Sequence, residues 1–331
     1  MIKSKKHIEI VRSTVSCLSS MSQESCDNIF DILNKYYTNI GVTVVNNLTD
    51  LEGLVACRPD LVFLGMEFIP LDESLGLADP SKIWLSSYFD QHNIVYTGSN
   101  QIAHKLTRYK HLAKAQVLES GLKTSLFFVQ QQNQPLVQED LTLKFPLFVK
   151  PNDRGGGLGI DNQSVVYDFL QLDAKVKSIT TNLKSDALIE EYLSGREFSV
   201  AILKKHNSPE FSVMPLELIA PIDPMGIQIL SSQVKSANAE QAIAVIDKNI
   251  KSQVIDLAMK VFETLSARDY GRIDIRFDQY GEPQFLEANL IPSLISGYGS
   301  FPKACVINLG LDYESMIIRI VQLGLARSMD I

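Results

Sequence analysis

The chain has 331 residues, of which 45% are apolar and 21% are charged, and it carries a net charge of −7. This composition is typical of a globular protein with two domains, or three small ones, that buries a sizeable core. The negative charge argues against broad nucleic-acid binding, because no basic stripe follows the short KSKK stretch at the N-terminus.

No stretch reaches the roughly 20 apolar residues of a membrane span, and the N-terminal residues lack the apolar run of a signal peptide. We therefore expect a cytoplasmic protein that binds no membrane. The four cysteines form no Cys-x-x-Cys pair and are predicted to be reduced thiols: Cys17, Cys26, Cys57 and Cys305. The five histidines form no metal motif, and His104 and His111 are predicted to lie on a helix surface.

In the first hundred residues, predicted strands alternate with predicted helices, which indicates a parallel, doubly wound sheet. Ser22 is a plausible N-cap for the first helix. The expected elements are a helix over 23–37, strands over 42–45 and 61–65, a helix over 81–91 and a strand over 94–97. Ser99 is then expected to cap one long helix, about 100–120, which Gly121 ends.

Beyond Gly121 the pattern changes to mixed α+β units. Strands are expected over 126–130, 145–150 and 187–193, with a helix over 165–177. Three strands should follow Gly195, then a helix near 248–267, a strand hairpin and a closing helix from about Tyr313. The predicted domains are therefore 1–104, 105–193 and 194–331.

The hairpin RIDIRFDQYGEPQFLEAN begins at Arg272 and shows the period-two alternation of a half-buried strand. Symmetric closure about its Tyr-Gly turn places Asp274 opposite Glu287 and Arg272 opposite Asn289. Directly opposed carboxylates repel each other, and a hard divalent cation such as Mg²⁺ is the simplest group to lie between them. The alternative is an exposed face on which Arg272 and Arg276 neutralise the acids.

The stretch FPLFVKPNDRGGGLGI carries an apolar strand that ends in Lys150, followed by a glycine-rich loop. Glycines let backbone N–H groups approach phosphate oxygens closely, and the lysine can meet phosphate as a point cation. The loop is not a Walker motif, because no GK[ST] closes it. An ordinary surface loop is the alternative interpretation.

In ALIEEYLSGREFSV, acids interrupt an apolar segment that joins two domains. Such a segment can offer backbone groups to an adenine edge, with Glu197 placed to accept ribose hydroxyls; ordinary strand-edge acids are the alternative. Lys110 and Lys114 form an i, i+4 pair on one helix face and, taken alone, are interpreted as a solvated face.

These four pieces, in this order, resemble the ATP-grasp ligases, and most closely the D-alanine–D-alanine ligase family. The resemblance runs from about Lys105 to the C-terminus and is strong over 190–203 and 271–289. It implies an α/β ATP-grasp fold, with an N-terminal doubly wound parallel-sheet domain followed by two α+β units that sandwich ATP.

The resemblance also implies roles for individual residues. Lys110 and Lys150 would hold the nucleotide phosphates, and Glu197 the ribose. A glycine loop would act as a lid over the nucleotide, and its residues are Gly155, Gly156 and Gly157. An adenine-binding segment would consist of Glu190, Glu191, Tyr192 and Leu193.

The cofactors implied are ATP and two Mg²⁺ ions, with Mn²⁺ as an alternative, bound by Asp274, Glu287 and Asn289. Arg272 would stabilise the transferring phosphoryl group, and the backbone N–H of Ser293 the tetrahedral intermediate. Two further residues would contact substrate: Ser300 and, as the nearest candidate for a flexible-loop lysine, Lys235. The implied reaction is amide formation through an acyl phosphate.

The sequence departs from the family at the substrate-facing parts. Serines within 13–25 stand where the family has an acid for the first substrate's ammonium, and GMEFIPLDESLG (65–76) replaces a histidine-glycine loop. Gly156 stands where the family has a serine. We therefore expect a carboxylate–amine ligase with a different first substrate, acting on amino-acid-like molecules, and a homodimer. The alternatives are a genuine D-alanine–D-alanine ligase and a non-catalytic ATP-binding protein.

Overall fold

The computed structural model describes residues 2–15, 18–223 and 226–327. The N-terminal unit contains a parallel sheet in the order β2-β1-β3, made of Tyr37–Val44, Ser4–Arg12 and Leu61–Leu64. Its helices are α1 (Gln23–Tyr36), α2 (Leu48–Ala56) and α3 (Leu85–Gln91), and a two-stranded hairpin pairs β4 (Phe68–Ile69) with β5 (Ile83–Trp84). The expected parallel arrangement is confirmed.

The central strand β1 was not among the predicted elements, because its first half is lysine-rich and resembles a polar terminus. Its second half carries Ile8, Ile10 and Val11, all fully buried, as expected of a strand covered on both faces. The strand predicted over 94–97 is reduced to a single bridge between Val62 and Tyr96. Ser22 caps α1 as predicted, since its side chain accepts a hydrogen bond from the Ser25 N–H.

The single long helix predicted over 100–120 is wrong. It is two helices, α4 (Gln101–Arg108) and α5 (Lys110–Glu119), separated by Tyr109 in an extended conformation. Asn100, rather than Ser99, caps the first of them, and its side chain accepts from the Ala103 N–H. The break frees the Lys110 N–H, which donates to the Asn152 carbonyl at 3.0 Å. This contact joins α5 to the segment between the strand Leu147–Pro151 and the glycine loop.

The central unit is a four-stranded antiparallel sheet in the order β6-β9-β7-β8. The strands are β6 (Phe127–Gln130), β7 (Leu147–Pro151), β8 (Val165–Val166) and β9 (Ala187–Glu191). Helix α6 (Phe169–Asn182) packs on it, and two short 3-10 turns lie elsewhere in the chain, at Gly76–Ala78 and Gln138–Asp140. The helix predicted over 165–177 therefore begins later, after β8, where Asp168 caps it.

The C-terminal unit is a five-stranded antiparallel sheet in the order β12-β11-β10-β13-β14. Its strands are β10 (Glu197–Lys204), β11 (Phe211–Ile219), β12 (Gln241–Ala244), β13 (Tyr270–Phe277) and β14 (Pro283–Asn289). Its helices are α7 (Ser232–Ser236), α8 (Lys248–Thr264), α9 (Ser300–Leu309) and α10 (Tyr313–Arg327). Of these helices, α8 and α10 match the predicted ones.

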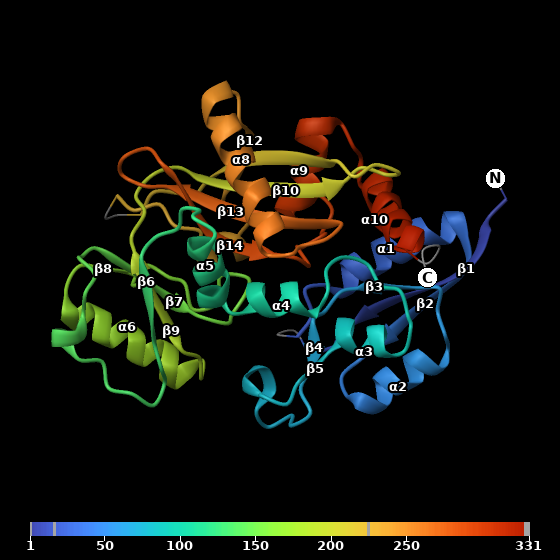
Figure 1. The fold of residues 1–331 in the computed structure, drawn as a ribbon, viewed down its shortest axis with the longest axis horizontal. Coiled ribbons are helices and arrows are strands. Elements are labelled where there is room, and N and C mark those ends of the chain that lie inside the picture. Colours follow the sequence, from blue (N-terminus) through green and yellow to red (C-terminus); the bar gives the residue numbers. More distant parts are fainter. Residues whose placement is uncertain (1, 16–17, 224–225, 328–331) are drawn as a thin grey trace.

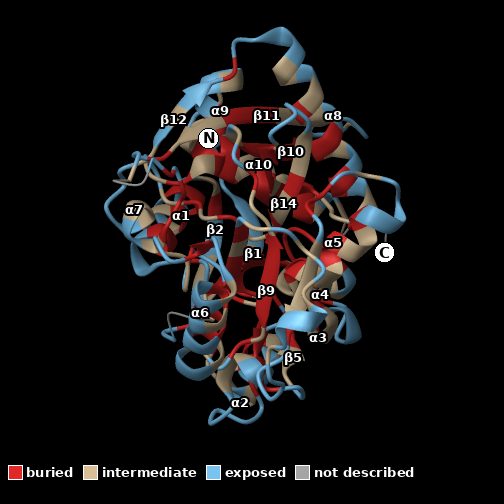
Figure 2. Cartoon of the chain, turned by 90° about the vertical axis from the view of Figure 1, so that its left-hand side faces the viewer, coloured by how far each residue is buried: buried red, intermediate tan, exposed pale blue. Residues whose placement is uncertain are grey.

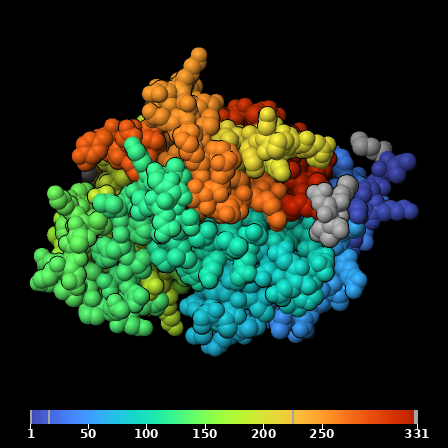
Figure 3. Space-filling model, in the orientation of Figure 1, coloured from blue at the N-terminus to red at the C-terminus, as the bar shows by residue number. Residues whose placement is uncertain are grey.

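One hydrophobic core joins the two ends of the chain, because residues of β1 and α1 pack in the same cluster as residues of β10, α9 and α10. Within it, the rings of Tyr270 and Phe301 meet edge to face with centroids 6.0 Å apart. Figure 1 shows the N-terminal unit (blue to cyan) and the central unit (green) beneath the C-terminal sheet (yellow and orange). In Figure 2 the buried residues run through the middle of the molecule, and in Figure 3 the three units pack directly against one another.

The described cysteines form no disulfide: Cys26 and Cys305 are buried free thiols and Cys57 is an exposed one, whereas Cys17 lies outside the described residues. Among the described helices, none has the length and apolar character needed to cross a bilayer. The domain boundaries at 104 and 193 stay a prediction.

Candidate active site

A cavity of about 570 Å³ is lined by residues of all three units. Most of the residues singled out from the sequence lie on its wall: Lys110, Lys150, Gly155, Gly156, Glu190, Glu191, Tyr192, Leu193, Glu197, Lys235, Arg272, Asp274, Glu287, Asn289, Ser293 and Ser300. Gly157 is the exception, because it packs against α7 instead. The fold therefore brings together residues that are up to 190 positions apart, from Lys110 to Ser300.

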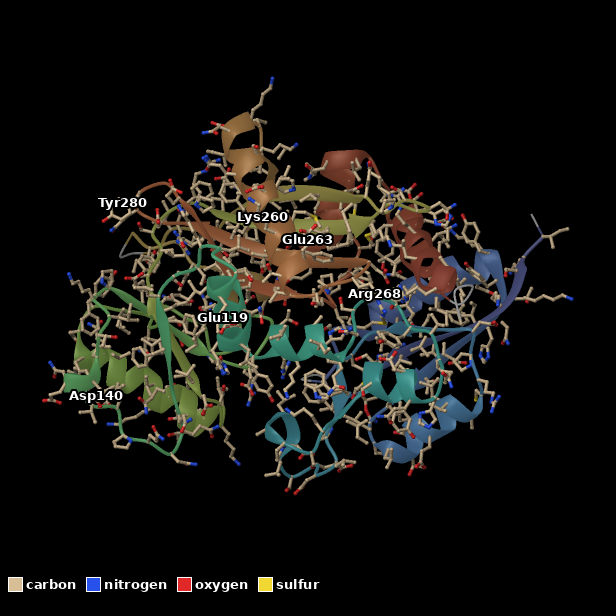
Figure 4. The ribbon with its side chains drawn as sticks, viewed as in Figure 1. Glu119, Asp140, Lys260, Glu263, Arg268 and Tyr280 are labelled. Carbon is tan, nitrogen blue, oxygen red and sulfur yellow. The ribbon has the colours of Figure 1, made fainter. Side chains whose placement is uncertain are left out.

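The predicted register of the hairpin is confirmed where it matters: Asp274 pairs with Glu287, and Arg272 with Asn289. Beyond Asp274 the register shifts, so that Ile275 pairs with Phe285 and the symmetric closure fails. The extra residue of β14 at this point, Leu286, moves the pairing by one, so that Asp274 faces Glu287 away from the turn. The turn at the other end carries Tyr280, which is 81% exposed at the edge of the molecule (Figure 4).

Each of the opposed carboxylates has a cation beside it. Asp274 accepts two hydrogen bonds from Arg272, at 2.9 and 2.8 Å, and one from the Ser199 hydroxyl at 2.8 Å. Glu287 lies 3.7 Å from the Lys110 ammonium. Burial raises the pKa of Glu287, but the positive charges of Lys110 and Lys150 lower it by a larger amount. The pKa is therefore below its usual value, and the group is ionised at neutral pH.

The alternative interpretation of the hairpin is therefore partly right. Arg272 does neutralise Asp274, but Arg276 pairs with Glu197 at 3.2 Å instead. The face is not exposed, since Asp274 is 8% exposed and lines the cavity.

The hairpin wall fits a hard divalent cation. Its carboxylate oxygens and the Asn289 side chain are the oxygen donors that Mg²⁺ prefers, and Mg²⁺ commonly takes one or two carboxylates together with substrate phosphates and water. No group of three or more His, Cys, Asp or Glu residues that could enclose a metal occurs among the described residues.

Lys150 of the cavity wall and Lys114, which is buried behind it, are tied to one buried acid. The Lys150 and Lys114 ammonium groups each lie 2.7 Å from a carboxylate oxygen of Glu190. Lys114 also donates to the hydroxyls of Thr124 and Ser125, at 2.7 and 2.9 Å. The interpretation of Lys114 as part of a solvated face is wrong, because its side chain is fully buried.

Electrostatics keeps this network charged. Burial raises the pKa of Glu190, but Lys114 and Lys150 lower it to about 2. Burial lowers the pKa of Lys114 to about 8, against the opposing effect of Glu190. The Glu190 carboxylate is already bound to the two lysines. The segment from Glu190 to Leu193 can therefore contact a nucleobase mainly through its backbone groups and its remaining side chains.

The backbone of that segment has one free donor. The N–H groups of Glu191 and Tyr192 donate to the carbonyls of Leu126 and Pro146. The N–H of Leu193 donates to no group in the described part of the chain, although the residue is buried at the cavity wall. Glu197 lies nearby, and its pKa is raised by burial. This arrangement suits a flat heterocycle with a sugar beside it.

The glycine loop packs against α7. The N–H of Ser232 donates to the Ile160 carbonyl at 3.1 Å, and a Cβ on Gly157 would lie 3.4 Å from Lys235. Lys235 is thereby held at the cavity wall, where its charge lowers the pKa of Glu287. From the sequence, Lys235 was only the nearest candidate for a flexible-loop lysine; in the structure it lines the cavity.

Replacing Gly159 by alanine is expected to weaken ATP binding and to destabilise the fold by about 1–3 kcal/mol. Its φ is +79°, and a Cβ there would lie 2.6 Å from Pro151 and 2.7 Å from Leu183. Gly53→Ala is the matched control, because nothing lies within 4 Å of a Cβ at Gly53, and Gly53 lies on α2 away from the cavity. Chemical denaturation and ATP titration of both variants measure the effect, and equal behaviour of the two would contradict it.

At the far side of the hairpin, the chain turns tightly around Ser293. Its hydroxyl is buried without a hydrogen-bond partner in the described residues, and a Cβ on Gly299 would lie 2.5 Å from its carbonyl oxygen. Ser300 begins α9, and the Tyr298 hydroxyl donates to the Lys235 carbonyl at 2.6 Å. The loop after β14 and helix α7 therefore meet over the cavity.

Sequence reasoning missed a polar cluster on the N-terminal side. Glu67 and Arg108 line the cavity. His104, predicted to be at a helix surface, is instead 1% exposed and lies 3.7 Å from Glu67. The prediction failed because the β4 loop, the segment 65–76 that contains β4, lies over α4 at His104. The only signal in the sequence was the stretch 65–76, which departs from the family pattern.

Comparison with known proteins gives a consistent result. A family model described as D-ala D-ala ligase C-terminus matches residues 120–322. An uncharacterized protein of Sinorhizobium fredii is 31% identical over 68% of this chain, and the match spans 64% of that relative. D-alanine–D-alanine ligase B of Clostridium perfringens is 23% identical, with 96% of this chain and 98% of that one covered.

Solved structures agree on the fold. The crystal structure of D-alanine–D-alanine ligase from Bacillus anthracis complexed with ATP superimposes with a TM-score of 0.75 at 19% identity, covering 99% of both chains. The enzyme from Coxiella burnetii gives a TM-score of 0.69 at 18% identity, covering 99% of this chain and 96% of that one. The expected ATP-grasp architecture is thereby confirmed along the whole chain.

Proposed function

The chain belongs to the D-alanine–D-alanine ligase family of ATP-dependent ligases that form C–N bonds, and we propose that it joins a carboxylic acid to an amine through an acyl phosphate. The observation that carries the proposal is the opposed pair Asp274 and Glu287, which shares one cavity with Lys110 and Lys150. Acids that face each other beside two lysines suit a bound polyphosphate and its cation.

In this proposal Lys110 and Lys150 hold the phosphates of ATP. The segment ending at Leu193 accommodates the adenine, and Glu197 accepts from the ribose hydroxyls. Asp274, Glu287 and Asn289 would hold Mg²⁺, which would neutralise phosphate charge there. The proposal includes two Mg²⁺ ions, with Mn²⁺ as an alternative.

The reaction has two steps. A substrate carboxylate oxygen attacks the γ-phosphorus of ATP, and ADP leaves. The amine nitrogen then attacks the acyl carbon, a tetrahedral intermediate forms, and phosphate leaves as the amide is completed. The side chains do little covalent work, so the rate depends on positioning and on charge stabilisation. Arg272 stabilises the transferring phosphoryl group, and the Ser293 N–H the oxyanion of the intermediate.

We further propose that the first substrate differs from that of the D-alanine ligases. This is supported by the serine-containing segment 13–25 and by the loop 65–76, which replace the family's substrate-facing residues. Ser300 and Lys235 also line the cavity. We assign Ser300 to the acceptor and Lys235 to the γ-phosphate.

The test is release of phosphate from ATP with pairs drawn from a panel of D- and L-amino acids, including D-alanine alone. We expect one carboxylate–amine pair to stimulate release well above the rate without an acceptor, with the amide detected by mass spectrometry. Formation of D-alanyl-D-alanine as the main product would establish the genuine D-alanine–D-alanine ligase instead. ATP binding without stimulation by any pair would contradict ligase activity.

A further inference from the structure

The cavity extends past Lys110 to a carboxylate that the reaction above does not use. Glu67 lines the cavity with its side chain 19% exposed. The nearest side-chain nitrogens in its ion-pair contacts are Nδ1 of His104 at 3.7 Å and Nη1 of Arg108 at 3.9 Å, both too far for a hydrogen bond. The carboxylate oxygens of Glu67 therefore have acceptor positions left open toward the cavity.

The groups around Glu67 are also short of partners. Nε and Nη2 of Arg108, and both ring nitrogens of His104, are buried and have no hydrogen-bond partner in the described residues. The Arg108 guanidinium is held over the Phe68 ring, 5.1 Å from its centroid. Buried polar groups in native proteins nearly always find partners, so this concentration of open positions beside a cavity is typical of a binding site.

The charges define what fits. Burial raises the pKa of Glu67, but His104, Arg108 and Lys110 together lower it by a larger amount. The net pKa is below its usual value, so the carboxylate is ionised. A ligand with a lone positive charge would be repelled by Arg108, and one with a lone negative charge would be repelled by Glu67. A group that carries an ammonium and a carboxylate side by side matches both residues.

The position of the pair agrees with the chemistry. Lys110 is close enough to lower the pKa of Glu67, and it also lies 3.7 Å from Glu287. A carboxylate bound next to Arg108 is thus adjacent to the end of the cavity assigned to the phosphates.

We propose that Glu67 and Arg108 bind the zwitterionic head of an α-amino acid that serves as the first substrate. The ammonium donates to Glu67, one carboxylate oxygen accepts from Nη1 of Arg108, and the other oxygen faces the phosphates. That this amino acid is the first substrate, the one whose carboxylate is phosphorylated, rests on the proposed function. It gives the chain a substrate-binding acid at Glu67, whereas serines within 13–25 stand where the family has its acid.

The test is calorimetric binding of a panel of D- and L-amino acids, each with its desamino analogue, to the full-length chain in the presence of a non-hydrolysable ATP analogue and Mg²⁺. The parent is expected to bind at least one amino acid and to discriminate against its desamino analogue. Glu67→Gln is expected to lower the affinity for that amino acid about 10- to 100-fold, as for loss of a charge-assisted hydrogen bond. Glu52→Gln, an exposed site on α2, is the control and should match the parent.

Two further variants separate binding from folding. Glu67→Asp keeps the charge and is expected to retain discrimination against the desamino analogue, whereas Arg108→Met should weaken the amino acid without affecting the nucleotide. Equal affinity of Glu67→Gln and the parent, equal binding of the two analogues, or no amino-acid binding by the parent would each overturn the proposal. A parent that binds an amino acid through Glu67 yet releases no phosphate with any acceptor would instead refute the ligase activity and retain this site.

Discussion

Replacing Arg272 by alanine is expected to lower kcat for amide formation about 10²- to 10³-fold, the usual effect of removing one group that stabilises transition-state charge. The KM for ATP should change little, because in the proposed site Lys110 and Lys150 hold the phosphates, and Asp274 keeps its hydrogen bond from Ser199. Steady-state phosphate release with the best substrate pair, together with direct ATP titration, measures both quantities. The same substitution separates an active ligase from a non-catalytic ATP-binding protein, in which turnover would be absent from the start.

The matched control is Arg196→Ala. Arg196 also makes a two-pronged contact with a carboxylate, that of Glu217, at 2.7 and 2.6 Å, but its side chain is 46% exposed. It should leave kcat unaltered. Arg272→Lys keeps the charge and loses the planar fork, so partial activity is expected. Equal turnover in Arg272→Ala and the parent would remove Arg272 from the mechanism.

Lys114→Met is the substitution expected to cost the most stability, about 3–5 kcal/mol, because it removes one partner from a buried ion-pair network. Glu190 would keep only Lys150, and the hydroxyls of Thr124 and Ser125 would lose their buried donor. Glu190 also positions Lys150, so the KM for ATP should rise as well. Urea denaturation and ATP titration test the two effects separately.

Lys123→Met is the control for this variant. Lys123 makes an ion pair of similar length with Glu282, 2.6 Å, but the two side chains are 57% and 53% exposed, and such pairs contribute about 0–1 kcal/mol. A double variant, Lys114→Met with Glu190→Leu, removes both charges and should be less destabilising than the sum of the single effects. A cost for Lys114→Met no larger than that for Lys123→Met would show that the network is not needed for stability.

The sequence predicted the hairpin well because the evidence there is local. Alternation of polar and apolar residues fixes which side chains share a face, and the Tyr-Gly turn fixes which of them oppose each other. The pairing of Asp274 with Glu287 also needs the bulge, because the register next to the turn would by itself place Asp274 opposite Leu286. The bulge after Asp274 was not predictable in this way, because it depends on how β14 packs against its neighbours.

The failures have one origin. Lys114 was interpreted as solvated and His104 as a surface residue because an i, i+4 pattern on a helix says nothing about what covers that helix. In the structure, β6 and the hairpin cover α5, and the β4 loop lies against α4. Strand β1 was missed because its lysines mask an apolar second half.

By itself, the sequence determined the ATP-grasp architecture, the nucleotide and metal candidates and their pairing along the hairpin, because these depend on patterns within short segments. Only the tertiary structure decided that Glu190 is committed to two lysines, that Lys235 reaches the cavity, and that Glu67 and Arg108 face it. Each of these depends on segments far apart in the chain meeting in a low-dielectric interior, where the energy of a charge is set by its neighbours in space and not by those in sequence.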